Sequence, residues 1–283
     1  MKKSKIIVPA LGILVLSTAA AVTGTVAWFT SNTLVNVSGM QLKVDPEEGM
    51  VVSNEAKASW NISTTATHTG KNANDEQLQF MLTSTSDLTA WYHNNSANAN
   101  SATAAESYAN VTPAKPAAGT DKTGIGVKTI DNVDKNIYLL NRFYIQSASN
   151  VNRAEQDLYV TEVAVTGSSN SAELNKALRV AFQLGNEQAI YAPFAGATYE
   201  YKVAGAETNT EALASKDANS EWVETVLASN TTIPAFTTGG DDAIEIEVYC
   251  YFEGEDAAAK SANITATLDT LAVSFRFGNR SHQ

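Results

Sequence analysis

Polar and apolar residues divide the start of the chain into three parts. Lys2, Lys3 and Lys5 come first, an almost wholly apolar run follows over residues 6–22, and the small residues 25–27 end the run. Positive charge, a short apolar core and a small-residue exit, in that order, are typical of a secretory signal peptide. We expect a signal helix over residues 1–27, cleaved between Ala27 and Trp28.

The same run has a second interpretation, an uncleaved membrane anchor. Residues 6–27 are close to the roughly 20 residues that a bilayer-spanning helix needs. Polar residues dilute the second half of the run, and strand-forming residues follow at once. Both features favour cleavage, with the retained anchor as the alternative.

After the small residues comes an extended, apolar-rich arm over residues 28–39. Its apolar members are Trp28, Phe29, Leu34, Val35 and Val37. Gly39 allows a turn, and apolar and polar residues then alternate over residues 40–45, as expected for a half-buried strand. Because an apolar arm is unfavourable in water, it has to pack on its own domain or on a neighbour. We therefore interpret residues 28–39 as a candidate donor strand for polymerisation.

Alternating or apolar stretches recur along the rest of the chain and predict strands. The clearest lie at residues 57–63, 78–83, 137–148, 158–165, 178–184, 244–252 and 268–277. We expect residues 137–148 and 158–165 to form an antiparallel pair joined by a turn. Many short strands with almost no long helix predict an all-β fold, a two-sheet antiparallel sandwich of jelly-roll type with short helices and long loops. Residues 40–283 would form a single β-sandwich domain.

Residues 93–122 are rich in Ala, Asn, Ser, Thr and Pro and contain almost no large apolar residue, which predicts a long surface loop. Aromatic residues near it and elsewhere can be interpreted as a sugar-binding face. They are Trp91, Tyr92, Tyr199, Tyr201, Tyr249 and Tyr251. A carbohydrate-binding or adhesion module on the cell surface is therefore an alternative function, although tyrosine on the solvent face of a strand is ordinary.

Charge and cysteine content narrow the classes of partner. The formal net charge is −11, with 30 acidic against 19 basic residues, which disfavours nucleic acid as a partner. Cys250 is the only cysteine, so an intrachain disulfide is impossible. It lies in phase with the apolar residues of 244–252, which predicts a buried structural thiol.

Motifs for catalysis are absent from the sequence. His68 and His93 do not belong to an HExxH motif, and no GxSxG, phosphate-binding loop or dinucleotide fingerprint occurs. We expect no catalytic or cofactor-binding residues. The acidic residues Glu253, Glu255 and Asp256 are the first choice for a calcium site, since calcium prefers several oxygen ligands from loops, but solvated loop charge explains them as well.

Two short runs carry a family resemblance. Residues 24–29, Gly-Thr-Val-Ala-Trp-Phe, are followed by residues 38–44, Ser-Gly-Met-Gln-Leu-Lys-Val. Together they resemble the start of the TasA/camelysin family, and residues 245–254 and 271–277 are similar to the closing strands of its jelly-roll domains. The resemblance implies a secreted filament subunit of biofilm matrix, processed by a signal peptidase of the SipW type. Camelysin itself has been classed as a metalloprotease, an activity for which this sequence has no motif.

Our expectation is a secreted structural protein of the extracellular matrix or cell surface, not an enzyme. It would polymerise into filaments by head-to-tail donation of its N-terminal strand to the next copy. Its partners would be other copies of itself and the signal peptidase during export, with other matrix components as further candidates. The membrane would be contacted through the leader alone.

Overall fold

The protein is described by a computed structural model that covers most of the chain after residue 31. The described residues are 32–44, 49–54, 65–68, 78–94, 108–117, 123–169, 174–194, 200–201, 210–237, 242–256, 259 and 267–283. The predicted signal peptide, Trp28, Phe29 and the predicted strand over residues 57–63 lie outside them. Within them almost every element is a strand, so the all-β prediction is confirmed.

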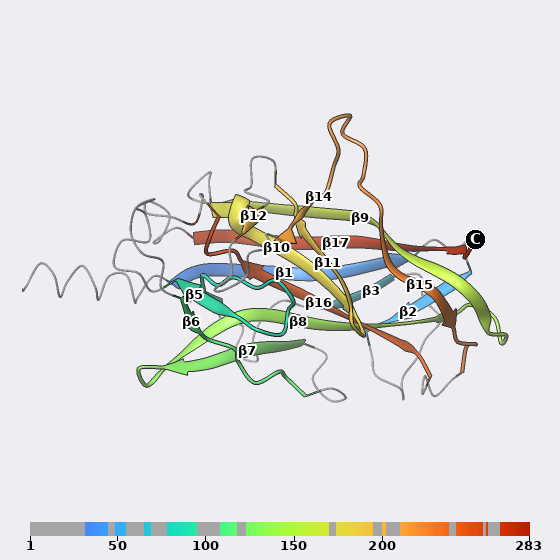
Figure 1. The fold of residues 1–283 in the computed structure, drawn as a ribbon, viewed down its shortest axis with the longest axis horizontal. Helices are drawn as coiled ribbons and strands as arrows, with labels where there is room; N and C mark the ends of the chain where they lie inside the picture. The colour runs from blue at the N-terminus through green and yellow to red at the C-terminus, as the bar shows by residue number, and fades with distance from the viewer. Residues whose placement is uncertain are drawn as a thin grey trace, which may run out of the picture.

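Seventeen strands and one short 3₁₀ helix, η2, are described (Figure 1). The strands are β1 (Asn32–Val44), β2 (Met50–Ser53), β3 (Thr65–His68), β4 (Leu78–Met81), β5 (Tyr92–Asn94), β6 (Tyr108–Asn110), β7 (Thr123–Ile130), β8 (Val133–Ser147), β9 (Arg153–Ser169), β10 (Leu178–Leu184), β11 (Glu187–Ala192), β12 (Glu200–Tyr201), β13 (Thr210–Glu211), β14 (Leu213–Ala214), β15 (Thr225–Ile233), β16 (Ile244–Phe252) and β17 (Thr267–Ser281). η2 spans Leu174–Ala177. Strands over residues 178–184 and 244–252 were predicted from the sequence with these bounds.

Thirteen of the strands form one continuous sheet. Its order is β14-β11-β10-β16-β8-β4-β1-β17-β9-β15, with β2 and β7 pairing with β8, and β3 with β1. The sheet curls, so that β15 at one edge approaches β10 and β11 near the other. The hydroxyl of Tyr191 on β11 donates to the carbonyl oxygen of Val223, just before β15, at 3.5 Å. Two halves of one curled sheet thus enclose a common interior.

The strands do not all run antiparallel, contrary to the prediction. β1 is parallel to β17 over nine residue pairs, and β4–β8 and β11–β14 are also parallel. Parallel neighbours need a crossover, whereas a tight turn joins antiparallel ones. β1 and β17 come from opposite ends of the chain, so no turn fixes their relative direction.

The predicted hairpin between residues 137–148 and 158–165 is also wrong. These residues lie in β8 and β9, which belong to distant parts of the sheet. β8 pairs with β16 and β7, while β9 pairs with β17 over thirteen residue pairs. Strand propensity identified both elements but says nothing of which edges meet.

The main core lies inside the curl and is centred on phenylalanine rings. Phe275 of β17 packs edge-on against Phe143 and Phe182, with ring centroids 5.2 and 5.1 Å apart. Phe277 lies 5.6 Å from Phe182, and all four rings are fully buried. Strands from the two ends and the middle of the chain therefore share one apolar core.

We expect Phe275→Ala to lower the free energy of unfolding by about 3 to 5 kcal/mol, because it leaves a cavity where three rings now meet. Val133→Ala is the matched control, since Val133 is 52% exposed and its truncation should change stability by about 0.5 kcal/mol or less. Urea titration of both variants measures the difference. Equal effects would show that the ring cluster does not stabilise the fold.

Candidate functional site

The N-terminal strand is the first candidate site, and its first half lies inside the sheet of its own chain. Residues 32–35 pair antiparallel with β4, from Asn32–Met81 to Val35–Leu78. On the other side Leu34 and Val35 pair in parallel with Thr267 and Leu268 of β17. The predicted arm residues Leu34, Val35 and Val37 therefore belong to β1, whereas Trp28 and Phe29 are outside the described residues. We call residues 32–37 the arm half of β1.

Residues 39–44 of β1 form the body half, and Ser38 separates the two halves. It pairs with β17 on one side and with β3 on the other. Met40, Leu42 and Val44 are buried and alternate with half-buried Gln41 and Lys43, which confirms the predicted half-buried strand.

The two halves of β1 meet at an irregular stretch of the strand. The register against β17 shifts between Val35 and Val37 and again between Val37 and Gly39. The predicted turn at Gly39 is wrong, because the chain stays extended and absorbs the extra residues as bulges. The arm half is therefore joined to the body by a locally disrupted ladder.

The second candidate, the proposed calcium ligands, lies at the end of β16. Asp256 accepts a hydrogen bond from the guanidinium of Arg179 at 2.9 Å, and both side chains are buried. The Glu253 carboxylate accepts the N–H of Glu255 at 3.0 Å. Glu253, Glu255 and Asp256 do not form a metal-ligating group, and no group of three such side chains occurs in the described residues. A calcium site here is thus not supported, since Asp256 is neutralised by Arg179.

Arg179 was not singled out from the sequence. A charged residue between the apolar Leu178 and Val180 of a strand was the available signal, because a buried cation needs an anionic partner. Its guanidinium also donates to the carbonyl oxygens of Lys176 and Leu178, at 2.8 and 3.0 Å. The result is a buried ion pair that joins η2, β10 and the end of β16.

Glu253 has the most perturbed carboxyl environment among these acids. Complete burial raises the pKa of Glu253 from 4.5 to about 7, although the positive charge of Arg179, the hydroxyl of Ser84 and the Glu255 N–H act in the opposite direction. Nearby, the ring nitrogen Nδ1 of His93 lies 2.8 Å from the carbonyl oxygen of Leu82. Burial lowers the pKa of His93, which keeps the imidazole neutral at pH 7. Glu253 is therefore a buried carboxyl group whose pKa lies near neutrality.

The pKa of Glu253 predicts a stability that falls as pH rises. Because the folded pKa lies above the unfolded value of 4.5, the folded state binds more protons between pH 4.5 and about 7. The contribution is complete below pH 4.5 and lost as pH passes 7, at about 1.4 kcal/mol for each pKa unit. Glu253→Gln should flatten this part of the profile, measured by urea unfolding from pH 4 to 8. An unchanged slope would assign the titration to another group.

The third candidate, the aromatic face, is buried. Trp91, Tyr249 and Tyr251 are each 1% exposed, so the prediction that they are exposed is wrong. Trp91 packs on Tyr138 and Tyr251 with centroids 4.7 and 4.9 Å apart. These three residues therefore cannot present a sugar-binding face, while Tyr92 is half-buried and the side chains of Tyr199 and Tyr201 are not described.

Two segments cover these rings, and one belongs to the predicted surface loop. Residues 84–92 fold over the sheet, and β5 pairs with β6. Val111, inside the predicted loop, is 3% exposed and joins the same cluster. The prediction of a surface loop is wrong for residues 108–111, which form β6 and bury Val111, because the sheet below supplies the large rings on which they pack.

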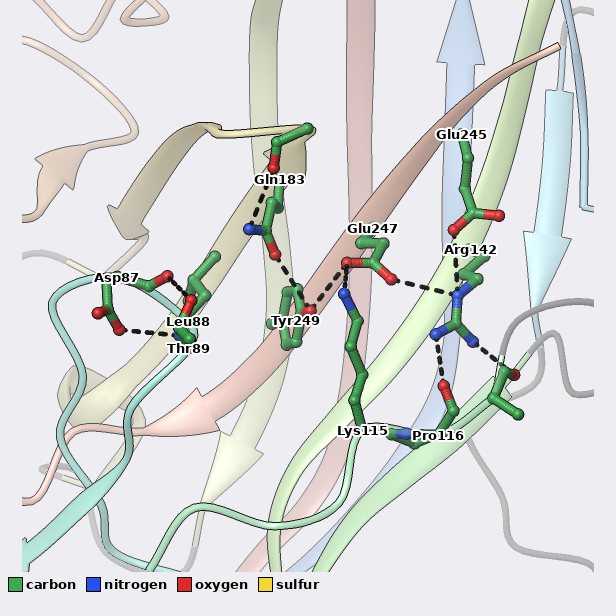
Figure 2. Close-up of polar contacts among 12 residues, drawn as sticks. Asp87, Leu88, Thr89, Lys115, Pro116, Arg142, Gln183, Glu245, Glu247 and Tyr249 are labelled. Carbon is green, nitrogen blue, oxygen red and sulfur yellow. Dashed lines mark hydrogen bonds and ion pairs between the residues drawn. The ribbon is translucent and has the colours of Figure 1, made fainter. Parts of the chain in front are cut away.

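An ion-pair network fastens residues 115–117 to the sheet (Figure 2). Arg142 of β8 is 1% exposed and donates to the carbonyl oxygens of Pro116 and Ala117, at 2.7 and 3.2 Å. The Nε atom of Arg142 lies 3.3 Å from carboxylate oxygens of both Glu245 and Glu247. One buried guanidinium thus joins the covering segment to β8 and β16.

Glu247 of β16 is the anionic centre of the network. It accepts from the Nζ of Lys115 at 2.6 Å and from the hydroxyl of Tyr249 at 2.9 Å, and Tyr249 also contacts the side-chain oxygen of Gln183 at 3.3 Å (Figure 2). Burial and the charge of Glu247 raise the pKa of Tyr249 far above its usual value, so the phenol stays protonated and donates. The whole arrangement satisfies buried polar groups and leaves no reactive nucleophile exposed among its members.

The covering segment requires two glycines in β7. A Cβ at Gly124 would lie 2.4 Å from Cβ of Pro116, and one at Gly126 would lie 2.5 Å from the ring of Tyr138. Side chains at either position would displace the segment or the ring. The role of these two glycines is therefore close packing.

We expect Arg142→Met to destabilise the protein by about 3 to 5 kcal/mol, because it leaves Glu247 buried with one partner fewer. Lys115→Met should cost about 1 kcal/mol or less, since the Lys115 side chain is 52% exposed and its ion pair is screened. Thermal or urea unfolding of the two variants checks this order. A larger effect at Lys115 would contradict it.

Cys250 is 3% exposed inside the main core, as predicted. Burial raises the pKa of its thiol strongly, so thiolate chemistry is disfavoured.

In the part of the chain that the structure describes, no helix is long and apolar enough to cross a membrane. No family model, curated protein or solved structure matches the chain. Evidence for the function therefore comes from the sequence pattern and from the geometry of β1.

Proposed function

We propose that the chain is a secreted structural protein that polymerises into extracellular filaments of biofilm matrix by donating its arm half to another copy. The observation that carries the proposal is the position of the arm half, between β17 and β4 and next to two register shifts. The bulged stretch can serve as a hinge, because its ladder is already disrupted. The body half remains anchored by its own pairs and its buried side chains.

Exchange between copies is possible because it replaces each backbone pair with an identical one. The slot that receives the arm half in one chain is present in every copy, so the same backbone pairs can form between chains. What exchange costs is mainly the entropy of association and any strain at the hinge. A donation that does not close on itself builds an open chain of subunits, which is a filament.

Export controls when exchange can begin. In this proposal residues 1–27 direct secretion, and a signal peptidase of the SipW type cleaves between Ala27 and Trp28. Before cleavage the apolar residues Trp28 and Phe29 continue the leader, which keeps the subunit monomeric inside the cell. The resemblance of residues 24–29 and 38–44 to the TasA/camelysin family supports this route.

The finer fold assignment, a jelly-roll sandwich, is part of the same proposal. A single sheet that curls over one core supports it, because two facing halves of such a sheet act as the two layers of a sandwich. The parallel pairing of β1 with β17 gives the slot its direction. An incoming arm has to run parallel to β17 and antiparallel to β4.

A disulfide lock tests arm donation. Val35 and Leu78 are directly opposite across β1 and β4, so cysteines at both positions can be bridged within one chain. We expect Val35→Cys with Leu78→Cys, oxidised as a monomer, to block filaments, and reduction to restore them. Oxidation after assembly should instead link neighbouring chains, giving a ladder of covalent multimers on a non-reducing gel.

The matched control locks the body half. Gln41 and Ser274 are partners across β1 and β17, in the part of β1 that stays in its own subunit. Gln41→Cys with Ser274→Cys should form the bridge and still assemble. Electron microscopy reads out both double variants, and filaments from the variant whose β1–β4 bridge was closed within the monomer would refute arm donation. Cys250 does not interfere, since it is buried.

A further inference from the structure

β4 depends on the arm half for most of its backbone pairing. Four residue pairs join β4 to residues 32–35, whereas the single pair Phe80–Asn136 joins it to β8. If the arm half leaves, β4 keeps one described ladder pair. A β4 that came loose would leave the slot with β17 as its only wall.

The residues just after β4 are tied to other parts of the sheet. The N–H of Thr83 donates to the carbonyl oxygen of Phe252, and the N–H of Gly254 donates to the carbonyl oxygen of Thr83, both at 3.0 Å. Ser84 and Tyr92 exchange two backbone hydrogen bonds, at 2.8 and 2.9 Å. None of these four bonds involves β1.

Burial and close packing reinforce these bonds. Thr83, Ser84 and Thr85 are 0 to 2% exposed. A Cβ at Gly254 would lie 3.3 Å from the carbonyl carbon and oxygen of Leu82, so the two backbones approach more closely than a side chain permits without a shift. The ring of Phe80, on β4 itself, packs on Phe252 with centroids 6.2 Å apart.

We propose that residues 82–84, tied to Tyr92 and to residues 252–254, form a clasp that keeps β4 in the sheet when the arm half leaves. The slot offered to the arm of a second copy then keeps both walls, β17 and β4. This inference rests on arm donation for its biological role, but the clasp is a property of the single subunit. A preformed slot binds a strand more tightly than one that must first reorder its wall, because less conformational entropy is lost on binding.

Hydrogen exchange of the full chain, read by mass spectrometry, tests the clasp. Val35→Pro removes a backbone N–H and disfavours the arm half's pairing. We expect residues 32–37 to lose protection in this variant, together with the β4 amides that donate to them, while the N–H groups of Thr83 and Ser84, which donate to Phe252 and Tyr92, keep theirs. Loss of protection at Thr83 and Ser84 as well would overturn the proposal, since the clasp would then open with the arm half.

A second substitution addresses the clasp itself. In the Val35→Pro background, Gly254→Ala should reduce protection of the N–H groups of Thr83 and Ser84 at least tenfold, because its Cβ pushes on Leu82. Gly185→Ala is the control: Gly185 has a positive φ of 61°, so alanine is strained there, but no atom lies within 4 Å of the added Cβ. The control should lower overall stability without a selective loss at Thr83 and Ser84. Equal losses in the two variants would overturn the clasp.

The unaltered chain provides an independent measurement if Val35→Pro fails to fold. Native-state exchange should show residues 32–37 opening at least tenfold faster than the N–H groups of Thr83 and Ser84, and equal rates would overturn the proposal. All of these experiments use monomer, so they separate the clasp from filament formation. A protein whose clasp residues stay protected but that forms no filaments would preserve the clasp and refute arm donation. Filaments from a protein whose clasp opens together with its arm half would preserve arm donation and refute the clasp.

Discussion

The parallel pairing of β1 with β17 is the constraint on which the architecture depends. It joins the first and last described strands over nine residue pairs and closes the interior around Phe275 and Phe277. Contacts between the two ends of a chain carry a large loop-closure entropy cost, because the loop that they close spans almost the whole domain. A pairing of this kind is costly to form and, at its bulged first half, locally weak. Stability of the body and mobility of the arm half can therefore coexist in one strand.

On the outer face of the sheet, buried ion pairs hold the segments that pack against it. Arg142 and Arg179 each lie on a central strand, and each is matched by carboxylates from β16 or the residues that follow it. Such pairs add little net stability over an apolar core, but an unmatched member is costly, so they favour one arrangement over alternatives. Both pairs hold segments next to the sheet, residues 115–117 in one case and residues 253–256, after β16, in the other. These segments have few apolar residues of their own, so the ion pairs fix their positions.

Sequence reasoning succeeded where the chain's own periodicity determines the outcome. The strand bounds of residues 178–184 and 244–252, the buried Cys250 and the alternation of residues 40–44 all follow from side-chain period and need no knowledge of partners. It failed where pairing decides. Nothing local distinguishes a β8–β9 hairpin from two distant strands, or identifies Trp91 and Tyr249 as the floor of a covered layer. Two signals were available, Arg179 in an apolar strand and the glycines at 124 and 126. Each indicates a close partner, but the sequence does not show which residue packs against it.

In the proposed mechanism, these two kinds of interaction are what would let one end of β1 be exchanged without loss of the fold. The body half is buried in the main core. Arg142 holds residues 115–117 against the sheet, and residues 32–37 take no part in these bonds. The arm half contributes backbone pairs to two neighbours, and the bonds of Thr83 and Gly254 hold one of those neighbours independently. If the clasp holds β4 as proposed, removing the arm half would open a defined gap between two fixed strands, β17 and β4. A gap with that shape is complementary to one segment above all others, the same residues of another copy.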